Sequence, residues 1–192
     1  MVNIVSVFWI TVLLFAVIGW MRGWAKELLV SFSVILSLAL NHVIYKYIPI
    51  AHDLSETDPS LFWVRLIILL VLVYFGYQTV VSIPHLAAKS RTEKLQDTLF
   101  GAFLGGLNGY LIAGTIIFYV VTAQAWFNLA NNCSKLPDHN YPFQNIIQIP
   151  TDPKLLDTVC HMMFYMPPQL LGEPGVYFAI ILAFVFVLVV YI

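Results

Sequence analysis

Apolar residues run along the chain in five long stretches that are separated by shorter polar segments. The stretches cover residues 3–20, 28–45, 61–83, 99–121 and 175–192, and only Arg65 brings a charge into any of them. A helix of roughly 20 such residues crosses a hydrocarbon core about 30 Å thick. The pattern therefore predicts an all-α fold, a polytopic transmembrane helical bundle of about five spans. The lipid bilayer is the first partner we expect.

Composition agrees with this interpretation. Of the 192 residues, 60% are hydrophobic and 10% are charged, whereas soluble domains carry about 25% charged residues. No polar stretch is long enough to build a separate core, so we expect residues 1–192 to form a single membrane domain. A formal net charge of −1 without a basic stripe gives no reason to expect a nucleic-acid partner. The first stretch follows no basic leader and is expected to remain as an anchor.

The distribution of charge predicts the orientation in the membrane. Basic residues follow the first and third apolar stretches, and short cytoplasmic loops are where basic residues accumulate. These residues are Arg22, Lys26, Lys89, Arg91 and Lys94. The segment after the second stretch is acidic, with Asp53, Glu56 and Asp58. We therefore expect the amino terminus outside, the carboxyl terminus inside, and residues 126–174 as a long outer loop.

A very short turn joins the first two expected spans. Its motif consists of Gly19, Arg22, Gly23, Lys26 and Glu27. Glycine permits a sharp bend, and so short a connection predicts an antiparallel hairpin whose charged residues lie at the level of the cytoplasmic headgroups.

The fourth expected span carries a glycine repeat. Gly101, Gly105 and Gly109 are spaced by four residues, which places them on one helical face. Such a face lets another helix approach closely in lipid. Asn108 lies beside it and should find a hydrogen-bond partner on another helix. The face could serve ordinary packing inside the bundle, or it could form a pore or dimer seam.

The connecting segments leave further alternatives open. Residues 84–97 could form a short interfacial helix or a solvated loop. Residues 151–166 are expected to form an amphipathic helix that either lies on the outer membrane face or plugs the bundle. Arg65 could extend to outer phosphates, pair with Asp58, or belong to a polar pathway. Cys133 and Cys160 could form a disulfide in an oxidising compartment, or remain thiols.

Motifs typical of enzymes are missing from the sequence. There is no P-loop and no His-Glu-x-x-His, and the histidines lack the spacing of metal ligands. We therefore expect no catalytic residues, no cofactor and no metal, and we expect the protein not to be an enzyme.

Two segments resemble the colicin V production protein family of bacterial inner-membrane proteins. Residues 19–29 read GWMRGWAKELL and look like that family's hairpin signature, and residues 95–109 read LQDTLFGAFLGGLNG and are similar to the entry of its last conserved helix. Thr98 and Asn108 stand where the family commonly has arginine. The resemblance covers roughly residues 1–122.

The resemblance implies a location and a broad role. It implies a multi-pass protein of the bacterial inner (cytoplasmic) membrane that supports toxin production or secretion, or envelope homeostasis, and it supplies no catalytic residues. We hypothesise that this role is exercised through helix–helix contacts, within a homo-oligomer or a larger complex. The alternatives are a channel or transporter, and an accessory subunit of a larger membrane complex.

Overall fold

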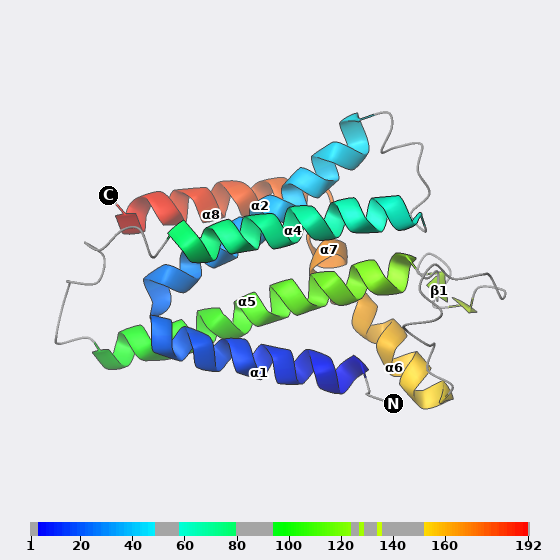
Figure 1. Cartoon of the computed structure of the whole chain (residues 1–192), viewed down its shortest axis with the longest axis horizontal. Helices are drawn as coiled ribbons and strands as arrows, with labels where there is room; N and C mark the ends of the chain where they lie inside the picture. The colour runs from blue at the N-terminus through cyan, green and yellow to red at the C-terminus, as the bar shows by residue number, and fades with distance from the viewer. Residues whose placement is uncertain are drawn as a thin grey trace.

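The computed structural model of the chain is built from long helices that run roughly along one axis (Figure 1). It describes residues 4–48, 58–79, 94–123, 127–128, 134–135 and 152–191. The long helices are α1 (Ile4–Arg22), α2 (Trp24–Tyr47), α4 (Pro59–Thr79), α5 (Lys94–Ala123) and α8 (Gly175–Tyr191). Two shorter helices, α6 (Pro153–Met163) and α7 (Pro167–Leu170), come before α8. Strands β1 (Phe127–Asn128) and β2 (Ser134–Lys135) pair antiparallel.

The predicted fold class is confirmed. Four helices, α1, α2, α4 and α5, are long and apolar enough to cross a membrane among the residues that the structure describes. The fifth expected span corresponds to α8, which is apolar but shorter, with 17 residues. The chain is therefore a multi-pass membrane protein, and its apolar helices imply contact with the lipid bilayer.

Two helices begin well before the spans expected for them. The second helix begins at Trp24 rather than at residue 28, and α5 begins at Lys94 rather than at residue 99. Hydropathy alone marks only the apolar part of a helix, whereas backbone hydrogen bonding continues through polar residues at its ends. The described part of the segment 84–97 thus belongs to α5, and the remainder lies outside the described residues.

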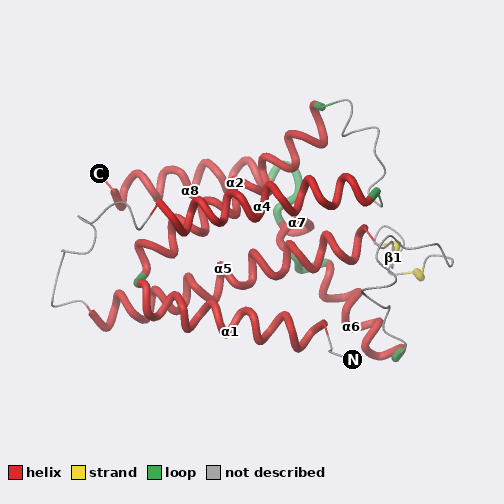
Figure 2. The backbone as a smooth tube through the Cα atoms, in the orientation of Figure 1, coloured by secondary structure: helices red, strands yellow, loops and turns green. Residues whose placement is uncertain are grey.

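The long helices form two groups: α1 with α5, and α2 with α4 and α8. Helix α1 lies along α5, while α2, α4 and α8 lie side by side above this pair (Figure 1, Figure 2). Helix α2 also packs against α5 and so links the groups. From the turn at residue 23, α1 and α2 diverge (Figure 1). The expected antiparallel hairpin is therefore open, and α5 packs against both of its helices.

Buried apolar residues join the helices at several places. Val30 and Val34 of α2 meet Leu69 of α4 and Leu111 of α5. Outward-facing positions are also apolar, which is expected where lipid is the solvent. On α1 these exposed residues are Val7, Trp9, Ile10, Leu13, Leu14, Val17, Trp20 and Met21.

The segment expected as an outer loop contains two helices that enter the bundle. Asp152 caps α6 by accepting a hydrogen bond from the Lys154 backbone N–H at 3.0 Å. The apolar side of α6 packs with Phe8 of α1 and Ile117 of α5, through Val159 and Met163. Of the two alternatives for this amphipathic helix, the structure favours insertion into the bundle.

The start of α7 packs against the middle of α5 rather than against its end. A Cβ atom at Gly114 would lie 2.9 Å from the Met166 sulfur and 2.7 Å from Pro167 Cδ. Gly114 is nine residues before the last residue of α5, or about 14 Å along the helix axis. Backbone N–H groups of the turn at residues 164–166 are bonded to carbonyls of α6. An irregular backbone is tolerated at such depth where protein surrounds it.

Candidate functional site

The turn between α1 and α2 consists of a single residue, Gly23. Its φ of 86° lies in the left-handed region that favours glycine. Because glycine offers no side chain to cap α2, the cap comes from a distant residue: Asp97 of α5 accepts a hydrogen bond from the Trp24 backbone N–H at 3.1 Å. The carboxylate also occupies the space beside Gly23, 2.8 Å from where a Cβ would lie. The starts of α2 and α5 are thereby joined.

The glycine repeat of α5 faces α1. A Cβ atom at Gly105 would lie 2.8 Å from Gly19 Cα, and one at Gly101 would lie 3.0 Å from Gly23 Cα. At Gly109 the nearest neighbours would be Phe15 Cβ at 2.8 Å and the α1 backbone at 3.0 Å. Each distance is too short for a real side chain, so the two helices approach through their backbones. The structure thus places this face in a contact within the chain.

A polar cluster lies next to this contact, at the junction of α2 and α5. Asn108 is fully buried, and its Nδ2 donates to the Glu27 carboxylate Oε2 and to the Glu27 backbone oxygen, both at 2.8 Å. The Ser31 hydroxyl donates to Asn108 Oδ1 at 2.7 Å. Both N–H groups and the oxygen of the Asn108 amide are therefore hydrogen-bonded to α2, as expected for an amide inside a bundle.

The carboxylate of Glu27 is also fully buried, and Arg22 supplies its counter-charge. Arg22 Nη1 lies 3.4 Å from Glu27 Oε1, and Nη2 donates to the Tyr77 backbone oxygen at 3.4 Å. The guanidinium stacks 4.3 Å from the centre of the Tyr77 ring. One arginine therefore connects α1, α2 and α4, and we call Arg22, Glu27, Ser31, Tyr77 and Asn108 the Glu27 cluster.

This arrangement corrects one expectation. The sequence places Glu27 in the turn between the first two spans, but the residue lies in the first turn of α2 and is enclosed by protein. Its expected level at the cytoplasmic headgroups stays a prediction. A carboxylate transferred away from water is costly unless it is paired and hydrogen-bonded, and the cluster supplies both. Lys26, its neighbour in the first turn of α2, is only partly buried.

Sequence reasoning named Arg22, Glu27 and Asn108, but it missed their partners Ser31 and Tyr77. It also missed the cap that Asp97 gives to α2 at Trp24. Ser31 lies four residues after Glu27 and so shares its helical face, which is a signal that could have been used. Nothing local identifies Tyr77, because its contact with Arg22 spans 55 residues.

The other candidate residues lie outside the Glu27 cluster. Cys160 is disulfide-bonded and buried; Cys133 lies outside the described residues, so a bond between the two stays a prediction. Among the described residues, no group of three His, Cys, Asp or Glu side chains could hold a metal ion. The Glu27 cluster has one carboxylate, and its chemistry is that of an internal ion pair and hydrogen-bond network.

Comparison with known protein families matches residues 6–135 to the family described as colicin V production protein. No curated protein matches the chain, and no solved structure matches it. The matched region covers more than half of the chain and includes both segments that meet at the Glu27 cluster, the hairpin turn and the glycine repeat of α5. The chain belongs to the colicin V production protein family.

Proposed function

We propose that this protein is a non-enzymatic component of the bacterial inner membrane that supports toxin production or secretion, or envelope homeostasis, through contacts between its helices and those of other membrane proteins. The observation that carries the proposal is the docking of the hairpin turn onto α5 around buried Glu27. It supports a rigid helical scaffold, and family membership supports the cellular role.

The scaffold leaves apolar faces available for partners. The glycine face of α5 is occupied by α1, so it is not free for a second protein. By contrast, the outer face of α1 exposes Ile10, Leu13 and Val17. In a membrane such a face contacts either lipid or another helix, and helix association there depends on close packing. We assign partner contacts to this face of α1.

The proposed orientation has the amino terminus outside and the carboxyl terminus inside, with residues 1–192 as one membrane domain. The contact of Trp24 with Asp97 supports it, because it brings the ends of α1 and α5 that carry the basic segments to one side of the bundle. A single cytoplasmic basic side is what the distribution of lysine and arginine predicts.

A photo-crosslinking residue in place of Leu13 tests the proposal in native membranes. We expect a defined membrane protein to be cross-linked and identified by mass spectrometry, and Leu13→Asn to weaken both this cross-link and toxin secretion or envelope integrity. The same probe at Phe184, an exposed residue of α8, is the matched control for lipid contact. Equal cross-linking from both positions, with Leu13→Asn cells behaving as wild type, would argue against contacts through α1.

Buried Glu27 favours a second candidate function, the conduction of protons or ions. Ionisable groups inside membrane segments often mark such pathways. Gln78, another polar residue of the spans, is less suited to such a path, since it is exposed and donates to the Tyr74 hydroxyl at 3.1 Å. Proton or ion flux through liposomes that contain the pure protein, abolished by Glu27→Gln, would establish this function. Without such flux, the scaffold function stands as the proposal.

A further inference from the structure

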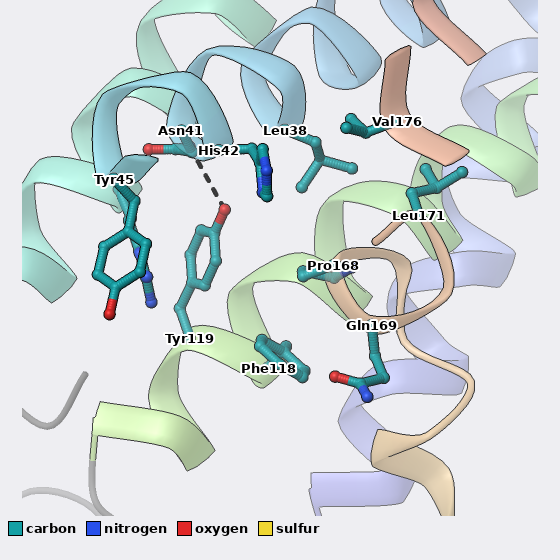
Figure 3. Close-up of a pocket in the computed structure, with 11 residues that line it drawn as sticks. Leu38, Asn41, His42, Tyr45, Phe118, Tyr119, Pro168, Gln169, Leu171 and Val176 are labelled. Carbon is teal, nitrogen blue, oxygen red and sulfur yellow. Dashed lines mark hydrogen bonds between the residues drawn. The ribbon is translucent and has the colours of Figure 1, made fainter. Parts of the chain in front are cut away.

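A cavity of about 260 Å³ lies where the ends of α2, α4 and α5 meet α7 and the start of α8. Figure 3 shows Asn41 of α2 and Tyr119 of α5 at one side, and Gln169 of α7 and Leu171 at the other. Asn41 Nδ2 donates to the Tyr119 hydroxyl at 3.3 Å. The cavity is separate from the Glu27 cluster and shares no residue with it.

Arg65 lines this cavity and has aromatic neighbours in place of an anion. Its guanidinium lies 5.4 Å from the ring centre of Tyr45 and 5.7 Å from that of Tyr119. Among the described residues, no carboxylate lies within 4.0 Å of it. Asp58, a partner in one of the three alternatives for Arg65, instead caps α4 by accepting from the Ser60 backbone N–H at 2.8 Å. The Arg65 guanidinium, with five N–H donors of fixed geometry, therefore borders a cavity that has room for a hydrogen-bond acceptor.

The charges around the cavity favour an anionic occupant. His42 lines the cavity, and its Nε2 lies 2.9 Å from the Glu173 carboxylate, which also lies 2.7 Å from Lys46 Nζ. The negative charge of Glu173 is thus already matched by these two groups. Partial desolvation between two rings strengthens the attraction of a guanidinium for phosphate or carboxylate.

The depth and walls of the cavity indicate which anion it suits. Arg65 is six residues after the start of α4, or about 9 Å along its axis, so it lies in the first two turns of this span, from which a long basic side chain can reach the lipid phosphates. Leu38 precedes Tyr45 by seven residues on α2 and lies about 10 Å deeper, and Val176 adds to this apolar wall. A polar mouth above an apolar wall matches a phosphate group attached to the glycerol end of a lipid.

We propose that this cavity is a binding site for the phosphate headgroup of a membrane phospholipid, with Arg65 as the residue that binds the phosphate and the apolar wall as the contact for the acyl-chain carbons next to the glycerol. Arg65 is suited to this role because a guanidinium can donate two parallel hydrogen bonds to phosphate oxygens. Tyr45 and Tyr119 hold the guanidinium in place.

Thermal unfolding of the purified full chain in detergent tests the proposal. Short-chain dihexanoyl phosphatidylglycerol should raise the unfolding temperature in a saturable way, whereas dihexanoylglycerol, which lacks the phosphate, should not. Arg65→Gln should weaken the apparent affinity about tenfold or more, the equivalent of one charge-assisted hydrogen bond. Lys154→Gln is the matched control, since Lys154 is basic but lies outside the cavity.

A second variant guards against a general folding defect. Gln169 is an exposed cavity-wall residue, so Gln169→Trp should fill the space and abolish the lipid-induced shift while Arg65 stays in place. An unchanged shift in both Arg65→Gln and Gln169→Trp would overturn the proposal. An equal shift from inorganic phosphate alone would also overturn it, because the site would then recognise a free anion rather than a lipid.

Discussion

At the scale of single residues, Glu27 explains how this bundle holds a charge inside it. Its carboxylate has a cation on one side and an amide on the other, at 3.4 Å from Arg22 and 2.8 Å from Asn108. Removing one partner would leave the other polar groups buried without a hydrogen bond or counter-charge. This costs more stability than replacing all of them with apolar residues. The cluster is therefore expected to fail as a unit.

Asn108→Leu should lower the free energy of unfolding by about 2 kcal/mol, because buried Glu27 and Ser31 lose their bonding partner. Thr115→Val is the matched control. Thr115 is equally buried on α5, but its hydroxyl bonds only to the Leu111 oxygen of the same helix. Reversible unfolding in mixed micelles with rising SDS measures both variants. Equal losses would mean that the bonds from Asn108 to α2 add nothing.

Glu173 gives the fold a pH dependence at the turn before α8. Hydrogen bonds from Lys46 and then His42 lower the pKa of Glu173 from its ordinary value of 4.5 to about 2. The ionised group therefore stabilises the folded chain above about pH 4.5, and this contribution is lost as the pH falls towards 2. The difference in unfolding temperature between wild type and Glu173→Gln should shrink over that range; a constant difference would contradict it.

At the scale of elements, the pairing of α1 with α5 depends on the absence of side chains. Lipid offers no hydrophobic drive for helices to associate, so contacts between backbones and small residues take its place. Gly19 on α1 opposes Gly101 and Gly105 on α5, and these glycines are 82 and 86 residues away in sequence. The motif thus defines which helix lies beside α5.

Two neighbouring glycines allow a matched test of this packing. Gly105→Ala would force a Cβ against the α1 backbone and should lower the free energy of unfolding by about 1–3 kcal/mol. Gly106→Ala should leave it unchanged or raise it by up to about 1 kcal/mol, because its Cβ would meet only Ala16 Cβ at an ordinary 3.6 Å. The same unfolding assay applies, and a Gly105→Ala variant as stable as Gly106→Ala would refute the close packing.

Sequence patterns predicted the elements better than their partners. The long apolar stretches indicated the spans, because length and hydropathy suffice for a membrane helix. Burial of Glu27 could not be foreseen, since its partner Asn108 is 81 residues away. The insertion of α6 and α7 was also open, because an amphipathic helix fits a membrane surface and a bundle interior equally well. The position of Met166 beside Gly114 of α5 supports insertion into the bundle.

At the scale of the whole molecule, two segments that are far apart in the sequence form one junction. The hairpin turn and the start of α5 meet at Asp97, at the glycines and at Asn108. This junction holds α1, α2 and α5 together, and Arg22 adds α4 through the Tyr77 oxygen. The cavity at Arg65 lies at the other end of these helices, so the bundle has two ends of different chemistry.

The proposed orientation can be tested with single introduced cysteines. Gln96→Cys lies near the start of α5 and Lys154→Cys near the start of α6, and both positions are exposed. A membrane-impermeant maleimide applied to intact spheroplasts should label Lys154→Cys and spare Gln96→Cys. The reverse labelling would overturn the orientation while leaving the helical bundle intact.

The most direct test of the account is a double-mutant cycle between Glu27 and Asn108, using Glu27→Leu, Asn108→Leu and the double variant in the unfolding assay. Residues that share one hydrogen-bond network are coupled, typically by about 0.5–3 kcal/mol. We predict a coupling of about 1 kcal/mol or more, with the double variant more stable than the sum of the single losses implies. Losses that add within about 0.3 kcal/mol would contradict the junction on which the fold and the proposed scaffold depend.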